Sequence, residues 1–192
     1  MKILVTGTEG YIGSLLAPIL MQSGHEVIRI DTGFYKVGLL YNDTALTAKT
    51  LNKDIRHITE DLQGVEAVVH LAESNTPAGQ LCPDVTYEIN YKGSVHLANL
   101  GSSASVRRVN TSSCSVYGVD TDNYVENSSV DNRSYRVSFE KINTILPGFK
   151  CEWNAIKGAG QLFDLFAAIN MSSTFLFRGF TRLKQLEYLI RT

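Results

Sequence analysis

A glycine triplet near the start of the chain constrains the fold more than any other feature. Gly7, Gly10 and Gly13 follow an apolar run, Ile3–Val5, and an apolar stripe at helical spacing begins directly after them. A strand, a tight glycine turn and a helix in this order predict the first unit of a parallel α/β sheet. The first glycine permits the turn, the second lets the backbone approach a phosphate, and the third lets the helix pack closely on the sheet.

The same turn predicts a dinucleotide site of the Rossmann type. Free N–H groups at the start of the helix face the phosphates, and the helix dipole favours negative charge at that end. The alternative is a glycine turn in an α/β protein that binds no ligand. The position of the triplet between a strand and a helix argues against that alternative.

Composition and charge are those of a globular domain. The 192 residues are 44% hydrophobic and 19% charged, which suffices for a sizeable core and excludes a disordered chain. The net charge of −1 supplies no basic field, so we expect neither nucleic acid nor membrane as a partner. The three cysteines lack zinc-ligand spacing, and no signal-peptide or membrane-spanning pattern occurs. We therefore expect a cytoplasmic protein without a metal site.

Strands alternate with helices along the N-terminal part of the chain. After a first strand that ends at Thr6, the pattern predicts strands at Glu26–Asp31, around Thr50–Asp54, at Ala67–Ala72 and at Val106–Ser113. It predicts a helix that begins near Ile12, is distorted at Pro18 and closes at Gly24, and another at about Pro83–Leu100. Strands that are apolar on both faces imply a doubly wound parallel sheet, and right-handed crossovers favour the order 3-2-1-4-5. The polar fifth strand suits an edge.

The texture of the sequence changes after Gly118. Residues 119–134 are polar and predict a surface loop or linker. Three helical segments follow at Val137–Leu146, Trp153–Ile169 and Thr181–Ile190, and we expect their apolar stripes to face a core. The expected organisation is a dinucleotide-binding domain at 1–118, the linker, and a helical part at 135–192 packed with the first domain as one unit.

Two carboxylates follow predicted strands and are candidate cofactor residues. Asp31 ends the second strand, near the offset at which an acidic residue bonds the 2′-hydroxyl of a ribose. A 2′-phosphate would be repelled there, so NAD is expected in preference to NADP. Asp54 follows the third strand and could reach an adenine edge, although a turn-forming or solvated aspartate remains an alternative at both positions.

Taken together, these residues resemble a known family. The motifs in chain order are Thr6–Gly13, Asp54–Ile55, His70–Ala72, Asn90 and Thr111–Gly118. This series is similar to the extended short-chain dehydrogenase/reductase family, specifically the NAD-dependent nucleotide-sugar epimerases and dehydratases. The resemblance is continuous from Met1 to about Glu126, and Tyr135–Val137, Lys141–Ile142, Leu146–Phe149 and Phe180–Lys184 resemble the C-terminal end of such enzymes.

The resemblance implies a role for each matching position. The pyrophosphate would be held by Gly7, Gly10, Tyr11, Ile12 and Gly13, and the adenosine ribose by Asp31. The adenine would contact Asp54 and Ile55, and the cofactor cleft would be lined by Leu71 and Ala72. Ser113 matches the serine that bonds the substrate hydroxyl in the family, and Asn90 would be a structural residue beneath the site.

The catalytic pair of the family has no counterpart in this chain. That pair is a tyrosine followed four positions later by a lysine, and none of the nine tyrosines has a lysine at this spacing. We infer a large internal deletion relative to the family, between Gly118 and the C-terminal motifs. A further departure is Glu73 after Ala72, because a carboxylate there would repel the cofactor phosphates unless its loop points it outward.

Other candidate catalytic groups are weaker. His70 lies in an apolar strand and is expected to be a buried, hydrogen-bonded histidine rather than a base. Cys114 has no paired base in the sequence and is expected to be an inert thiol.

Three functional hypotheses remain. The first is an NAD(H)-binding truncated relative without normal turnover. The second is an active NAD-dependent epimerase, dehydratase or oxidoreductase acting on a nucleotide sugar, in which Tyr117, Tyr124 or a tyrosine of another chain replaces the missing pair. The third is a scaffold: the helix at Pro83–Leu100 should expose apolar surface, so either the C-terminal helices cover it or the chain forms a homo-oligomer through an interface unlike that of the family.

Overall fold

The chain divides into two compact units. The structure is a computed structural model that describes residues 1–38, 49–59, 62–74, 81–111, 138, 140–171 and 177–192. The first unit comprises Met1–Asn110 together with Leu162–Thr192, and the second comprises Thr111–Gln161. The expected organisation into 1–118, 119–134 and 135–192 stays a prediction.

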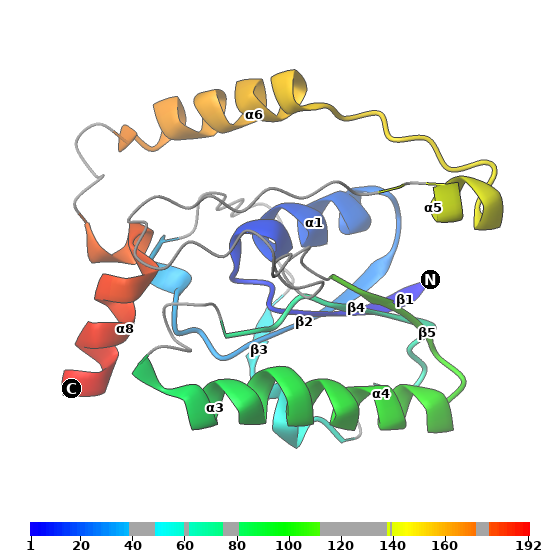
Figure 1. The fold of residues 1–192 in the computed structure, drawn as a ribbon, viewed down its shortest axis with the longest axis horizontal. Helices are drawn as coiled ribbons and strands as arrows, with labels where there is room; N and C mark the ends of the chain where they lie inside the picture. The colour runs from blue at the N-terminus through cyan, green and yellow to red at the C-terminus, as the bar shows by residue number, and fades with distance from the viewer. Residues whose placement is uncertain (39–48, 60–61, 75–80, 112–137, 139, 172–176) are drawn as a thin grey trace, which may run out of the picture. The chain divides into compact units, whose positions relative to one another are not determined.

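The first unit is built on a parallel sheet. Its five strands have the order β3-β2-β1-β4-β5 (Figure 1). Their bounds are β1 Lys2–Thr6, β2 Glu26–Asp31, β3 Thr50–Asn52, β4 Ala67–His70 and β5 Arg107–Asn110. The central strand β1 pairs with β2 on one side and β4 on the other, so that Leu4 lies between Ile28 and Val68. The predicted doubly wound fold and strand order are confirmed.

Both faces of the sheet are covered by apolar contacts. Leu4, Ile30 and Val68 pack with Leu97 in a cluster on one face. The alternate residues of β1, Ile3 and Val5, belong to a second cluster on the other face. Because successive side chains of a strand point to opposite faces, this division explains why the strand sequences are apolar throughout.

Helix α1, Tyr11–Gln22, covers one face of the sheet (Figure 1). It is continuous through Pro18, whose side chain is buried. The helix is closed as predicted by Gly24, which has a φ of +82°, a conformation that favours glycine.

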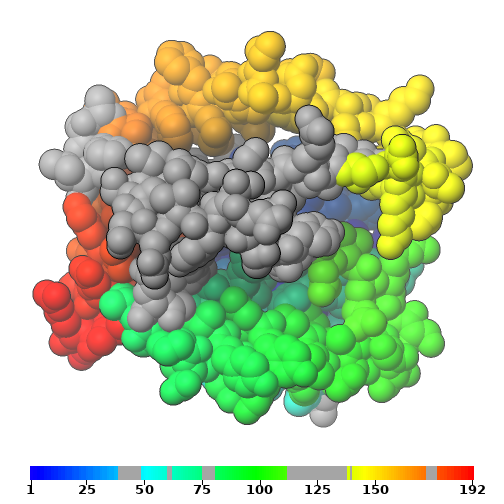
Figure 2. Space-filling view, in the orientation of Figure 1, coloured from blue at the N-terminus to red at the C-terminus, as the bar shows by residue number. Residues whose placement is uncertain are grey.

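A long helical stretch covers the opposite face. It consists of α3 (Pro83–Tyr87), a π-helical segment η4 (Glu88–Gly93) and α4 (Ser94–Ser103). The predicted helix is therefore present, with one widened turn at its centre. It lies along the surface of the molecule in Figure 2 and exposes several large apolar side chains, namely Val85, Tyr87, Tyr91 and Val95.

Two strands end earlier than the sequence predicts. β4 ends at His70 rather than Ala72, and β5 ends at Asn110 rather than Ser113. All four residues of β5 are exposed, and β5 is the last strand of the sheet. The expectation of a polar edge strand is confirmed.

The described residues of the C-terminal part form the α-helices α5 (Glu140–Ile145), α6 (Ala155–Ala168) and α8 (Arg182–Arg191). A short 3₁₀ turn, η7 (Arg178–Phe180), precedes α8. The positions of α5, α6 and α8 agree with the three predicted helical segments. Among the described residues, no helix is long and apolar enough to cross a membrane.

The expectation that the stripes of these helices face a core is wrong for α5 and α6. No residue of either helix is buried, and the predicted packing residues Ile142, Leu162 and Phe166 are each more than one third exposed. In α8 the one buried side chain is polar, Gln185, while Leu183 is exposed. An amphipathic pattern indicates a helix, but it does not say which surface the helix will meet.

Gly13 provides a direct test of the close contact between α1 and the glycine turn. A Cβ at Gly13 would overlap the carbonyl oxygen of Gly7 and lie 2.7 Å from the Cα of Thr8. We expect Gly13→Ala to lower the free energy of unfolding by about 3 kcal/mol, because backbone rather than a flexible side chain must move.

Gly158→Ala is the control, because a Cβ at this position in α6 meets nothing within 4 Å. It should leave stability unchanged or raise it by up to about 1 kcal/mol through helix propensity. Denaturant unfolding of both variants measures the difference, and equal stabilities would contradict the account.

Candidate functional site

The glycine turn joins the C-terminal end of β1 to α1. Gly7 has a φ of +74°, and its N–H donates to the carbonyl of Ile30 at 2.8 Å. A Cβ at Gly7 would lie 2.7 Å from the backbone nitrogen of Ala72 and 2.8 Å from the carbonyl carbon of Leu71. The turn therefore packs directly against the backbone that follows β4, which only glycine permits.

The start of α1 is free of side-chain caps. Gly10 is the N-cap, no side chain caps the N–H groups of the first turn, and that turn contains no acidic residue. The exposed side chains of Tyr11 and Ile12 lie at this end of the helix. Unpaired N–H groups at a helix start, with the helix dipole behind them, form a binding site for anions such as phosphates.

Thr8 adds a further unsatisfied group to the turn. Its side chain is fully buried, and its hydroxyl oxygen has no hydrogen-bond partner. Buried hydroxyl groups without a hydrogen-bond partner are rare in folded proteins.

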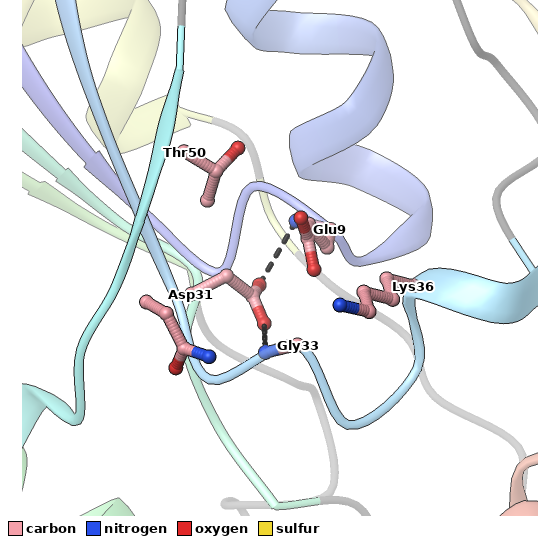
Figure 3. A pocket seen from close by; sticks show the side chains of 6 residues that line it. Glu9, Asp31, Gly33, Lys36 and Thr50 are labelled. Carbon is pink, nitrogen blue, oxygen red and sulfur yellow. Dashed lines mark hydrogen bonds between the residues drawn. The ribbon is translucent and has the colours of Figure 1, made fainter.

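Asp31 connects the glycine turn with the loop that follows β2. Its Oδ2 accepts a hydrogen bond from the backbone N–H of Glu9, and its Oδ1 accepts one from the N–H of Gly33, both at 2.9 Å (Figure 3). The carboxylate is thereby fixed at the rim of a small pocket. The residues that line this pocket are Glu9, Asp31, Gly33, Lys36, Thr50 and Asn52.

Glu9 and Lys36 are site residues that the sequence analysis missed. The ammonium group of Lys36 points toward the carboxylate of Glu9 in Figure 3. Burial, with the nearby charge of Asp31, raises the pKa of Glu9 above its ordinary value of 4.5, and Lys36 and Arg29 act in the opposite direction. The only signal in the sequence was the position of Glu9 inside the glycine triplet.

The predicted adenine contacts have structural roles of their own. Asp54 accepts hydrogen bonds from Arg56 Nε at 3.0 Å and Nη2 at 2.7 Å, and the side-chain bond to Arg56 lowers the pKa of Asp54. Ile55 is buried in the core, where it contacts the helix at Gly93. A role of either residue toward adenine stays a prediction.

His70 is a buried, hydrogen-bonded histidine, as the sequence predicted. Its Nδ1 lies 2.8 Å from Thr6 Oγ1, and its Nε2 lies 2.9 Å from Ser94 Oγ. Thr6 Oγ1 also accepts the N–H groups of Leu71 and Ala72, and a neutral ring that is protonated at Nε2 and accepts the Thr6 hydroxyl at Nδ1 satisfies all of these contacts. Desolvation lowers the pKa of His70, which favours this neutral form.

The same hydrogen bonds fix the positions of the two residues that were predicted to line the cofactor cleft. Leu71 and Ala72 follow β4 and are held by Thr6, beside the glycine turn. Asn90 holds the loop that follows β4 through two hydrogen bonds to the backbone of Ser74. Its Oδ1 accepts from Ser74 N, and its Nδ2 donates to Ser74 O at 2.8 Å. The expectation of a structural role for Asn90 is confirmed, and Glu73 in the same loop is exposed.

The predicted catalytic positions lie outside the described residues. Ser113, Cys114, Tyr117 and Tyr124 all belong to the segment 112–137. Lys92, the lysine nearest to the family spacing, forms an exposed ion pair with Glu88 one turn away. Among the described residues, no cluster of histidine, cysteine or carboxylate side chains could hold a metal ion.

The geometry therefore combines a glycine turn, an uncapped helix start and a carboxylate at the end of β2, on a sheet of order 3-2-1-4-5. The model of the NAD dependent epimerase/dehydratase family matches residues 3–139. The chain belongs to this family. The resemblance inferred from the sequence motifs is thus confirmed.

Proteins similar to this epimerase/dehydratase family member include two from bacteria. The chain is 34% identical over 134 residues to protein CapI of Staphylococcus aureus, which covers 63% of this chain and 40% of CapI. It is 33% identical over 129 residues to a UDP-glucose 4-epimerase of Klebsiella pneumoniae. The matched region is 62% of this chain and 93% of that protein.

Two solved structures are also similar to this chain. The UDP-glucose-4-epimerase of Stenotrophomonas maltophila with bound NAD and formylated UDP-arabinopyranose has a TM-score of 0.50 and 30% identity, covering 63% of this chain and 39% of its own. The NAD dependent NDP-hexosamine 5,6-dehydratase TunA has a TM-score of 0.50 and 33% identity, covering 70% and 44%. The chain spans about two fifths of CapI and of these two structures.

The pH dependence of stability tests the environment of Glu9 in this family member. The raised pKa means that the folded state binds the Glu9 proton more tightly than the unfolded state, so ionisation of Glu9 costs stability. We expect Glu9→Gln to raise the Tm at pH 7. The gain should shrink as the pH falls toward and below 4.5, because Glu9 then becomes protonated in both states.

The matched control is Glu152→Gln, which removes an exposed carboxylate in the second unit. Thermal unfolding of both variants between pH 4 and pH 8 is the measurement. A Glu9→Gln curve parallel to that of the parent protein would show that Glu9 is not held in an unfavourable environment.

Proposed function

We propose that this chain binds NAD(H) at the glycine turn Gly7–Gly13 and has no normal catalytic turnover. The observation that carries the proposal is the start of α1, where Gly10 is the N-cap and neither a capping side chain nor an acidic residue occupies the first turn. The N–H groups of Tyr11, Ile12 and Gly13 would bind the diphosphate. The bound cofactor would supply hydride transfer, and these residues supply its binding and orientation.

The pocket at Asp31 would hold the adenosine ribose of the cofactor. The carboxylates of Asp31 and Glu9 both line it, so the 2′-phosphate of NADP would meet two negative charges. Lys36 compensates only part of this charge. We therefore propose NAD in preference to NADP, in agreement with the NAD named for the two structures above.

The absence of turnover is inferred from the missing tyrosine and lysine. Proton transfer to or from a sugar hydroxyl needs a group with a suitable pKa within hydrogen-bonding distance. No tyrosine of this chain is followed four positions later by lysine, and Ser113 alone has no activating partner in the sequence. We propose that an internal segment bearing the pair is absent relative to the family.

Two alternatives rest on specific observations. Retention of Ser113 and of the cofactor turn favours an enzyme acting on a nucleotide sugar, in which Tyr117, Tyr124 or a tyrosine of a second chain transfers the proton. The exposed apolar side chains at Tyr87 and Tyr91 favour a scaffold that self-associates.

A fluorescence titration with NADH and NADPH tests the proposal. We expect saturable NADH binding and weaker NADPH binding, and Asp31→Asn should reduce the difference by about tenfold because one charge is removed from the ribose pocket. Asp164→Asn, which removes an exposed carboxylate on α6, is the matched control and should change nothing. Absence of NADH binding at millimolar concentration would contradict the proposal.

Incubation of the protein with NAD⁺ and UDP-glucose separates binding from turnover. We expect no epimer in the NMR spectrum. Formation of UDP-galactose that is abolished by Ser113→Ala would instead establish the active-enzyme alternative.

A further inference from the structure

A guanidinium group from the C-terminal helix lies beside the glycine turn. The guanidinium carbon of Arg182, the first residue of α8, is 4.5 Å from the ring centroid of Tyr11 and 4.3 Å from that of Tyr35. Its Nη2 lies 3.8 Å from the position that a Cβ of Gly10 would occupy. All these residues belong to the first unit.

The position of Arg182 is fixed by contacts of its own segment. The carbonyl of Phe34 accepts a hydrogen bond from Gln185 Nε2 at 3.0 Å, so α8 is attached to the loop after β2. A Cβ at Gly179 would lie 2.8 Å from the carbonyl oxygen of Val37, which shows that the backbones of η7 and this loop touch. Arg182 is therefore held at the turn by backbone packing as well as by its own side chain.

The charge of Arg182 is not neutralised by the described residues. No carboxylate among them forms an ion pair with Arg182, and none of them accepts a hydrogen bond from it. Stacking on two aromatic rings occupies the faces of the guanidinium and leaves its N–H groups at the edge available for an acceptor.

A positive charge such as that of Arg182 is unusual beside the N-terminus of a helix, here α1. The N-terminus of a helix carries a partial positive charge, so a cation near it is unfavourable unless an anion lies close to both. The first turn of α1 contains no acidic residue. Arg182 and the uncapped N–H groups of α1 thus lie close together at Gly10, where an anion would interact favourably with both.

We propose that Arg182 contacts the diphosphate of the bound dinucleotide, so that α8 completes a cofactor site otherwise built by the N-terminal part of the chain. This inference rests on the proposed binding of NAD(H). The segment farthest from the glycine turn in sequence then contributes directly to cofactor affinity. The two tyrosines orient the guanidinium, and Tyr11 Oη donates to the carbonyl of Phe180 at 3.5 Å.

The test compares Arg182→Met with Lys184→Met. Both remove one positive charge from α8 and keep an unbranched side chain, but Lys184 is exposed and forms no hydrogen bond or ion pair with the described residues of the turn. We expect Arg182→Met to weaken NADH and ADP binding about tenfold, the loss of one charge-assisted hydrogen bond, and to reduce the salt dependence of both. Lys184→Met should bind as the parent protein does.

Binding of adenosine distinguishes a contact between Arg182 and phosphate from a role of Arg182 in holding the pocket in shape. Adenosine has no phosphate, so its dissociation constant, obtained by competition with NADH and corrected for the NADH affinity of each variant, should be unchanged in Arg182→Met. An equal loss of ADP and adenosine affinity would mean that Arg182 only supports the fold of the pocket, and unchanged ADP affinity would mean that it does not contact phosphate. Either result would overturn the inference.

A third variant covers a failure of Arg182→Met to fold. Arg182→Lys keeps the charge but loses the stacking of the planar guanidinium on the two tyrosine rings, so its ADP affinity should lie between those of the parent protein and Arg182→Met. A loss as large as that expected for Met would overturn the inference. If the parent protein itself binds neither NADH nor ADP, it is the proposed function that fails.

Discussion

The rest of the structure depends on the contact between the glycine turn and the end of β4. At Gly7 the backbone has a positive φ and lies so close to Leu71 and Ala72 that no side chain fits. This contact places the start of α1 at the carboxyl ends of β1 and β4, which is the region where open parallel sheets bind ligands. The hydroxyl of Thr6, shared between His70 and the two following N–H groups, holds the same end of β4 in place.

Charge then determines what the site can accept. The start of α1 attracts anions, whereas Asp31 and Glu9 make the neighbouring pocket acidic. Under the proposed function, a ligand with a diphosphate in its middle and an uncharged ribose diol beside it would satisfy both parts, and one with an additional 2′-phosphate would not. Arg182 lies beside the start of α1, where the diphosphate is expected, and it does not line the ribose pocket. Cofactor preference and diphosphate affinity would therefore be set by different residues.

Much of this arrangement could be predicted from local sequence, because its determinants are local. The glycine triplet, the apolar strands and Asp31 each lie in a short pattern, and the strand order follows from chain connectivity. Glu9 and Lys36 were missed because their proximity depends on how two loops fold back on each other. Arg182 was missed for a stronger reason: it lies 171 residues after Tyr11, and no periodicity connects them. The apolar stripes in the sequences of α5 and α6 correctly predicted helices. They did not predict that the apolar side chains are exposed, because exposure depends on tertiary partners.

The most direct test of the central claim is hydrogen exchange of the backbone amides at the start of α1, measured with and without NADH. If the uncapped N–H groups bind the diphosphate, Tyr11, Ile12 and Gly13 should exchange more slowly when NADH is present, and the amides of α6 should not change. Unchanged exchange at Tyr11–Gly13 under saturating NADH would show that the glycine turn is not the cofactor site, whatever the chain binds elsewhere.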